Sequence, residues 1–463
     1  MSATSALPKQ IRALLVARAV NQLGGFSLAF LTVLLTRSFG ASLTAAGIVS
    51  AAFGLATIPS RLAGGRLADR WGRRRTIVAG LVGCAVAQLG LAAAPGMVAA
   101  TVCAVLLGLA FELFEPPSQA AIADAVPPAG RASAFELFAT ALAAGSLAAG
   151  VIADVVGRWS LRWLFVVDAG TGLVCAVIVW LALASDHPRS TDRPSEPDLA
   201  AAASSLPPEQ LPEPGLAAAA AESGPVVAAA AAAAAESVPP ADRPAAIAAP
   251  PAVSPWRDRA LLLVTAAGTV FALVSMLMLT GLPLSLAALG LNPADAGLIM
   301  AASTATLVLA RPVLRNRRLA GLPHSATFVL GYVLMAAGFG GYALAHTLPT
   351  LVVPTALYSL GNVLVMGRSF AVVSELAPAV ASARYLAVYG SSWGVATLLA
   401  PLVVTWLIGV SGPALLWGAS AVVCSAMAVA QPWVVRRVRG PLRDLGVIHS
   451  TKAVAERYDA VSI

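Results

Sequence analysis

The sequence predicts an all-α polytopic membrane protein, with twelve transmembrane helices in two six-helix pseudo-repeats. Three observations carry this prediction. Of the 463 residues, 58% are hydrophobic and 11% are charged, with a mean hydropathy of +0.82, a composition that excludes an ordinary soluble globular protein. The apolar residues form runs of about 20, the length that a helix needs to cross the bilayer. The basic residues gather between those runs, as orientation signals do.

The predicted spans form two groups of six around a long polar segment. They lie near residues 11–36, 43–64, 76–94, 97–122, 132–156 and 161–184, and near 258–284, 295–313, 325–346, 350–373, 383–409 and 413–434. The segment between the groups is rich in alanine, proline and acids, a composition that favours a disordered cytoplasmic linker. We therefore predict a first bundle (1–184), a linker (185–256), a second bundle (257–435) and a basic cytoplasmic tail (436–463).

The distribution of basic residues predicts that both termini are cytoplasmic. One side of the predicted topology holds Lys9, Arg12, Arg66, Arg70, Arg73, Arg74, Arg75, Arg131, Arg311, Arg315, Arg317, Arg318, Arg384, Arg436, Arg437 and Arg439. The opposite side holds only Arg37, Arg158 and Arg162. Short cytoplasmic segments collect Lys and Arg, which places both termini on the cytoplasmic side. We therefore expect a multi-pass protein of the cytoplasmic membrane, in contact with the lipid bilayer. We also expect it to be a monomer.

The two predicted bundles read as copies of each other. Gly47 and Arg61 recur as Gly297 and Arg311 at an offset of 250, and Asp124, Pro127 and Arg131 are echoed by Glu375, Pro378 and Arg384 at offsets of 251, 251 and 253. Six-span repeats in the same orientation place a binding site at the interface between the halves, near mid-membrane.

The segment Gly65–Arg75 concentrates charge between two apolar runs, with five arginines and Asp69 in what we expect to be a short turn at the membrane surface. It matches Gly-x-Leu-Ala-Asp-Arg-x-Gly-Arg-Arg, the signature between spans two and three of the major facilitator superfamily, at every principal position. The chain resembles this superfamily over nearly its whole length. The stretches Pro116–Asp124 and Arg18–Gly24 also resemble its drug:proton antiporter branch.

Two features depart from that antiporter branch. The stretch Gly145–Val151 has no proline where antiporters usually carry a Gly-Pro-rich signature in span five. The arginine often found in the middle of span four is also missing. Both departures leave the major facilitator fold as the expectation and weaken the prediction of an antiporter.

The resemblance implies a cytoplasmic gate built on Gly65, Asp69, Arg70, Gly72, Arg73 and Asp124. Asp69 is expected to cap span eleven of the other half, near 382–384, where an anion is stabilised by about 0.3–1 kcal/mol. Arg73 is expected to pair with Asp124. Such contacts hold the cytoplasmic side closed and break when the transporter opens inward. A plain positive-inside loop would explain the arginines, but not the two glycines and the acid at these spacings.

Span four carries the most informative intramembrane charges. We expect Glu112 and Glu115, with Gln119 one turn further, to share one helical face. A charge near the bilayer centre costs about 2.5–3.5 kcal/mol, so Glu112 should face a cavity. Proton binding, attraction of a cationic substrate and a structural pair with Arg18 are all open roles. The repeat partner of Glu112 is approximately Asn362, which keeps a polar group without the charge.

Two further stripes are candidates for the cavity wall. Arg18, Asn21, Gln22 and Gly25 recur at i, i+3, i+4 and i+7 of span one and favour a cavity-facing stripe, although Arg18 could instead snorkel to the surface. Tyr385, Tyr389 and Trp393 recur at i, i+4 and i+8 of span eleven. They suit either helix packing or stacking on a lipophilic substrate.

The combined prediction is a secondary transporter that exports a small amphiphilic or cationic compound in exchange for protons by alternating access. The alternatives are a proton-coupled importer of a polar nutrient and a transporter-like sensor or assembly partner that moves nothing. No Walker loop, catalytic triad or metal-ligand spacing is present, and the four cysteines lie inside apolar runs. We therefore predict a non-enzymatic protein without cofactor or metal, and no partnership with nucleic acid.

Overall fold

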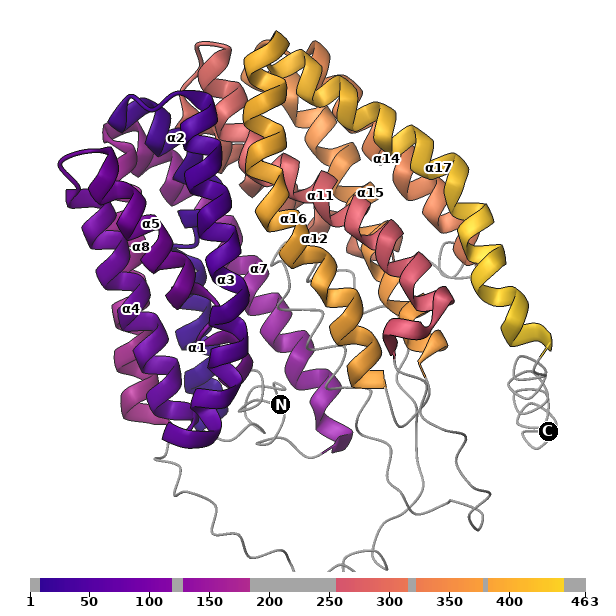
Figure 1. The fold of residues 1–463 in the computed structure, drawn as a ribbon, viewed down its shortest axis with the longest axis horizontal. Helices are drawn as coiled ribbons and strands as arrows, with labels where there is room; N and C mark the ends of the chain where they lie inside the picture. The colour runs from indigo at the N-terminus through magenta and orange to yellow at the C-terminus, as the bar shows by residue number, and fades with distance from the viewer. Residues whose placement is uncertain (1–8, 119–127, 184–254, 315–321, 378–381, 445–463) are drawn as a thin grey trace, which may run out of the picture.

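The computed structural model describes residues 9–118, 128–183, 255–314, 322–377 and 382–444, and these residues are helical apart from short turns (Figure 1). Helices of the first half and helices of the second half form two bundles that lie side by side. Within these described residues, eleven spans are long and apolar enough to cross a membrane, and a shorter apolar helix covers Leu28–Phe39. The predicted all-α polytopic class is confirmed.

The described residues of the first half form seven long helices. They are α1 (Lys9–Gln22), α2 (Ser27–Phe39), α3 (Leu43–Trp71), α4 (Arg73–Ala93), α5 (Met97–Phe111), α7 (Pro128–Trp159) and α8 (Leu161–Ala182). Ser42 and Ser160 cap α3 and α8 by accepting backbone N–H bonds, which explains why these helices begin where they do. The side chains of α7 are described from Leu142 onward.

The second half contains α11 (Arg259–Ala288), α12 (Ala296–Leu314), α14 (His324–Leu344), α15 (Leu348–Leu376), α16 (Ser382–Ser411) and α17 (Pro413–Asp444). The short 3₁₀ turns η4 (Pro255–Arg257) and η5 (Pro293–Asp295) precede α11 and α12. Nearly all of the predicted linker lies outside the described residues, as do 445–463 of the predicted tail. Helix α17 runs ten residues past the predicted end of its span at 434.

Span one is not the continuous helix over 11–36 that we predicted. A turn over residues 23–26 separates α1 from α2, with Leu23 and Gly24 donating backbone bonds to Val20 and Asn21. The turn coincides with Gly24-Gly25, and glycine carries the largest backbone entropy cost inside a helix. The predicted i+7 member of the stripe, Gly25, therefore lies beyond the end of α1.

Span four is interrupted as well. Helix α5 ends at Phe111, residues 112–114 form a turn, and a helical turn over 115–118 follows. The prediction that Glu112 and Glu115 share one face of a continuous helix is therefore wrong. Because Pro117 has no N–H to donate to the carbonyl of Leu113, the backbone ahead of the prolines lacks a helical bond. Gln119 and Asp124 lie outside the described residues.

The charged segment Gly65–Arg75 is also not the short turn that we predicted. Helix α3 continues to Trp71, and α4 begins at Arg73, so that Gly72 alone separates them. Gly72 has φ = 84°, a backbone conformation that other residues adopt rarely. The guanidinium of Arg74 lies 4.0 Å from the ring centroid of Trp180 and links the start of α4 to the end of α8.

Candidate functional site

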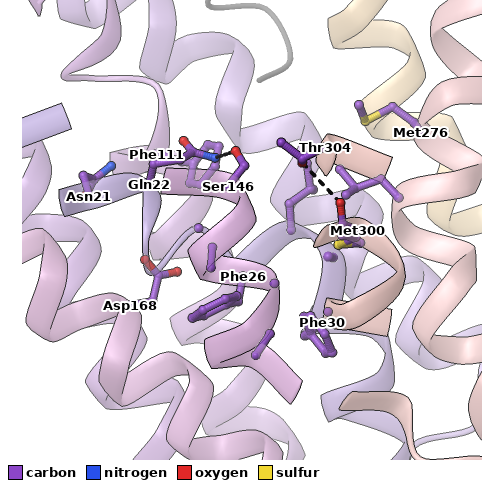
Figure 2. A pocket seen from close by; sticks show the side chains of 18 of the residues that line it. Asn21, Gln22, Phe26, Phe30, Phe111, Ser146, Asp168, Met276, Met300 and Thr304 are labelled. Carbon is purple, nitrogen blue, oxygen red and sulfur yellow. Dashed lines mark hydrogen bonds between the residues drawn. The ribbon is translucent and has the colours of Figure 1, made fainter. Parts of the chain in front are cut away.

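A cavity of about 320 Å³ lies between the two halves. Helices α1, α2, α3, α4, α5, α7 and α8 line it from the first half, and α11, α12, α15 and α16 line it from the second. Much of its wall is apolar and includes the side chains of Phe26, Phe30, Phe111, Met276 and Met300 (Figure 2). Its size falls within the range of pockets that hold drug-sized molecules.

Among the described lining residues, the charged side chains all come from the first half, namely Arg18, Glu112, Glu115 and Asp168. Arg18 donates from Nη2 to Oε2 of Glu115 over 2.5 Å, and both side chains are buried. The Arg18 guanidinium also lies 5.0 Å from the ring centroid of Phe114. A buried ion pair is costly to break, because removal of one partner leaves the other charge uncompensated. The interpretation of Arg18 as a snorkelling residue is therefore wrong.

Glu112 has a weaker set of contacts than Glu115. Its backbone N–H donates to Oγ of Ser60 over 3.2 Å, which fixes the residue at the end of α5. Its Oε2 atom is buried without a hydrogen bond, and Nη1 of Arg61 is 3.9 Å away. A carboxylate with a buried, unsatisfied oxygen beside a cavity is well suited to accept a proton or a cation.

Polar side chains of α1 continue the charged side of the cavity. Gln22 donates from Nε2 to Oγ of Ser146 on α7 over 3.0 Å, and Asn21 lies beside it (Figure 2). Arg18, Asn21, Gln22 and Gly25 all line the cavity, so the structure brings the predicted stripe of span one together despite the break in the helix.

The described residues that the second half contributes to the lining are uncharged. Ser275 donates to Oδ1 of Asn362 over 2.9 Å, and the hydroxyls of Ser303 and Ser359 share a hydrogen bond. Asn362, the predicted repeat partner of Glu112, thus lines the cavity but has its amide oxygen occupied by a neighbour.

The predicted aromatic stripe of span eleven is divided between two environments. Trp393 lines the cavity and packs edge-on against Phe271, with ring centroids 6.1 Å apart. Tyr385 and Tyr389 are not among the lining residues. The Tyr385 hydroxyl donates to Oδ2 of Asp258 over 2.8 Å, and Tyr389 is buried against Phe370. Helix packing is therefore the better interpretation for both tyrosines.

The gating residues are placed only in part. Asp69 and Arg70 are exposed at the end of α3, and Arg73 is partly buried at the start of α4. Asp124 lies outside the described residues, as do the side chains near the start of α16. Among the described charged groups of the cavity lining, the sequence analysis did not single out Asp168. An acid within an apolar run was the signal, but only tertiary structure assigns its partners.

A second set of contacts joins the halves at the end of the bundle away from the chain termini. Arg158 donates from Nη2 to Oδ1 of Asp154 over 2.8 Å and to Oδ1 of Asp295 over 2.5 Å. Arg37 donates to the carbonyl oxygen of Ala287 over 2.5 Å. Helices α7 and α12 cross nearby, where Gly150 and Gly297 pack too closely for a Cβ on either residue. Within the described residues, no group of acids, histidines or cysteines has the arrangement of a metal site.

The cavity and the two-bundle fold can be compared with known proteins. A sequence profile of the Major Facilitator Superfamily matches residues 14–212 and 258–459, which is most of the chain.

Curated relatives match over shorter stretches, and the chain spans about a third of their length. An uncharacterized MFS-type transporter of Bacillus subtilis, YqjV, is 32% identical over 143 residues, which are 31% of this chain and 35% of the relative. The multidrug resistance protein MdtH of Aeromonas hydrophila is 33% identical over 140 residues, 29% of this chain and 34% of that protein. A Na⁺, Li⁺, K⁺/H⁺ antiporter of Planococcus maritimus is 34% identical over 118 residues, 24% of this chain and 27% of the antiporter.

Solved structures show the same fold at low sequence identity. A POT family transporter in complex with 5-aminolevulinic acid gives a TM-score of 0.67 at 12% identity, covering 94% of this chain and 100% of the other. The POT family transporter PepTSo gives 0.68 at 18% identity, covering 93% and 98%. These likenesses concern the fold alone.

Proposed function

This chain belongs to the Major Facilitator Superfamily, and from that premise we propose that it exports a small amphiphilic cation in exchange for protons. Its family and fold neighbours are transporters rather than enzymes. In the proposed cycle, the central cavity opens to the two sides of the membrane in turn.

The observation that carries the proposal is the charge of the cavity. Among the described lining residues, the three carboxylates of Glu112, Glu115 and Asp168 share the wall with one guanidinium, that of Arg18. Arg18 is hydrogen-bonded to Glu115, and Arg61, which is not one of these lining residues, lies 3.9 Å from Glu112. Low-dielectric walls strengthen the attraction of such a site for a cation. The phenylalanine and methionine side chains would bury the apolar part of the same substrate.

Exchange follows from competition for the same negative charge. A cation bound near Glu112 replaces the need for a proton there, and a proton bound to Glu112 removes the attraction for the cation. Burial of the Glu112 carboxylate with neither a bound proton nor a bound cation is unfavourable, since a charge in the membrane interior costs about 2.5–3.5 kcal/mol. The empty, deprotonated cavity would therefore change its orientation slowly, whereas either loaded form would change it readily.

The inter-half contacts of Arg158 and Arg37 support the alternating part of the proposal. With both termini on the cytoplasmic side, these contacts lie at the outer end and hold it closed. Opening outward requires the Arg158–Asp295 pair and the close α7–α12 crossing to separate. Formation of the predicted contacts of Asp69 and Arg73 would then close the cytoplasmic end.

The names of two relatives support the outward direction, since one is a multidrug resistance protein and another is a cation/H⁺ antiporter. Each match covers less than a third of this chain, so direction and substrate rest on experiment.

The direct test uses purified protein in liposomes with an imposed pH gradient and a fluorescent organic cation such as ethidium. We expect the cation to move in the direction opposite to the flow of protons. An uncoupler, which collapses the pH gradient, should abolish this movement. Uptake of a polar nutrient together with protons would instead establish the importer. Absence of any gradient-driven flux across a panel of dyes, drugs and nutrients would favour the non-transporting sensor.

A further inference from the structure

We propose that the contact formed between the halves by Asp154, Arg158 and Asp295, here called the outer latch, takes up a proton when it closes and releases it when it opens. This inference rests on the proposed alternating access, and it adds a control by the outside pH that is separate from the cavity carboxylates. Asp154 and Arg158 lie on α7, whereas Asp295 lies in η5 of the other half. Opening of the outer end therefore separates the two acids.

Two carboxyl groups of the outer latch face one guanidinium. A single atom, Nη2 of Arg158, donates to Oδ1 of Asp154 over 2.8 Å and to Oδ1 of Asp295 over 2.5 Å. Because both oxygens accept from the same nitrogen, the two acids lie beside each other, and their side chains are also in hydrogen-bond contact. Two carboxyl groups share a hydrogen bond only when one of them carries a proton, since an ionised carboxylate has none to donate.

The charge balance of the closed latch favours the same proton. The side chains of Asp154 and Asp295 are only 11% and 5% exposed, so that solvent screens their repulsion poorly. With both acids ionised, the three groups carry one net negative charge between the halves, and a proton on either acid removes it. The Arg158 side chain is 47% exposed and lies one residue before the end of α7, so water reaches the latch from this side.

The backbone keeps the two acids together while the outer end is closed. A Cβ added to Gly150 would collide with the carbonyl oxygen of Gly297, and one added to Gly297 would lie 3.0 Å from the backbone nitrogen of Asp154. On the other side of Asp154, a Cβ added to Gly157 would lie 2.7 Å from that of Ala294. Such close packing on both sides holds Asp154 against its partner acid, so a proton relieves their repulsion where a backbone shift would not.

The charged groups of the neighbouring helices leave this balance unchanged. Helices α11 and α12 pack against η5, and α1, α8 and α12 pack against α7. Arg37 of α2 donates to the carbonyl oxygen of Ala287 at the end of α11, and Arg162 of α8 donates to two carbonyl oxygens at the end of α4. Beyond the latch and Arg162, the described charged side chains of these helices are Arg18 and Asp168, which line the cavity, and Arg259 at the other end of α11. His346 is exposed in the turn between α14 and α15.

Acid on the outer side therefore favours the closed outer latch. In the open form the two acids are separated and solvated, and a solvated aspartate is ionised at neutral pH. Because the closed form holds one proton more than the open form, the ratio of closed to open molecules rises as the pH falls, by up to about tenfold per pH unit. The outside pH would thus bias the orientation of the cavity without any proton entering it.

The test measures opening of the outer end as the distance between spin labels at Val98→Cys on α5 and Leu344→Cys on α14. Both positions are exposed and lie in opposite halves, and the four native cysteines are replaced by alanine in the full-length protein. In nanodiscs between about pH 5 and about pH 8, we expect the closed fraction to fall as the pH rises. Asp154→Asn and Asp295→Asn each keep a hydrogen-bonding side chain without the second charge. Both should stay closed, with a ratio that varies by less than about twofold over this range.

Two further variants serve as controls. Arg37→Gln removes a contact across the same end that involves only a guanidinium and a backbone carbonyl. It should lower the ratio of closed to open molecules by the same factor at every pH, because arginine does not titrate in this range. Glu112→Gln removes a cavity carboxyl group and should keep the pH dependence of the outer end.

Several outcomes would overturn the inference. A wild-type ratio that does not change with pH would do so, as would an unchanged pH dependence in Asp154→Asn and Asp295→Asn. Loss of the dependence in Glu112→Gln, with its retention in both latch variants, would assign the proton to the cavity. Unfolding temperatures establish that each variant is folded, and either latch variant alone carries the test. Liposome flux separates this inference from the proposed function: a pH-sensitive outer end without cation movement refutes export, whereas export with a pH-insensitive outer end refutes the latch.

Discussion

The two halves share one topology, but they differ in the continuity of their cavity-lining helices and in the charged side chains found there. In the first half, spans one and four are both interrupted, at residues 23–26 and 112–114, and charged side chains lie at or near both interruptions. Their counterparts in the second half, α11 and α15, run unbroken for 30 and 29 residues despite Pro283 and Pro354. Irregular backbone at membrane depth is tolerated where it lines a cavity. The comparison indicates that the first half carries ionic chemistry and the second half provides a neutral wall.

The position of Arg18 makes the contrast specific. The residue 250 positions later is Gly268, where the ring of Tyr389 packs so closely that a Cβ would collide with it. A guanidinium in one repeat is thus matched by a buried aromatic contact in the other. The second half obtains packing energy at the position where the first half holds a charge.

The largest expected effect is that of Arg18→Gln. Removing the guanidinium leaves Glu115 buried without its 2.5 Å partner, which typically costs about 3–5 kcal/mol. We expect a large fall in the unfolding temperature in detergent and loss of transport. The double variant Arg18→Gln/Glu115→Gln should recover much of the stability, because no uncompensated charge remains. A single variant as stable as the wild type would show that the pair contributes little to the fold.

The next largest effect on transport is expected from Glu112→Gln, compared with a substitution of its repeat partner Asn362. Glu112→Gln should reduce cation movement driven by a pH gradient by about tenfold or more, because an amide cannot exchange a proton. Asn362→Ala removes the counterpart side chain without changing charge and should reduce transport by only about twofold or threefold. Proteoliposome flux with and without the gradient measures both. Similar losses in the two variants would contradict the division between an ionic half and a neutral half.

The sequence was sufficient for the all-α membrane class and for several residues of the cavity wall, for physical reasons that act locally. Apolar runs of bilayer length and basic turns identify spans without tertiary information. The interruptions were harder to predict, because Gly24-Gly25 and Pro116-Pro117 are compatible with a kinked helix as well as with a turn. The role of Tyr385 required the structure, since its partner Asp258 is 127 residues away. The cavity position of Asp168 likewise depends on how α8 packs beneath the turn of span one.

A smaller effect on transport is expected from substitution of Asp69, an acid that has no counterpart in the second half. The exposed Asp69 lies near the end of α3, whereas the corresponding segment 311–325 of the second half contains no acid. If Asp69 caps span eleven when the cytoplasmic side closes, Asp69→Asn should lower transport several-fold, in keeping with a contact worth about 0.3–1 kcal/mol or more when partly buried. Membrane insertion and the unfolding temperature should be unchanged. Arg66→Gln is the matched control, and normal transport by Asp69→Asn would reduce the segment to an orientation signal.

The smallest effect is expected from the pair of side chains that occupies the positions of Arg73 and Asp124 in the second half. His324 and Glu375 lie 251 positions after Arg73 and Asp124, and Nε2 of His324 is 3.0 Å from Oε1 of Glu375. Because the Glu375 side chain is 44% exposed, solvent weakens this contact, and we expect His324→Gln to lower the unfolding temperature only slightly. Transport should stay near the wild-type level, measured as proteoliposome flux. A loss of transport as large as that expected for Asp69→Asn would show that the two halves contribute equally at this end of the molecule.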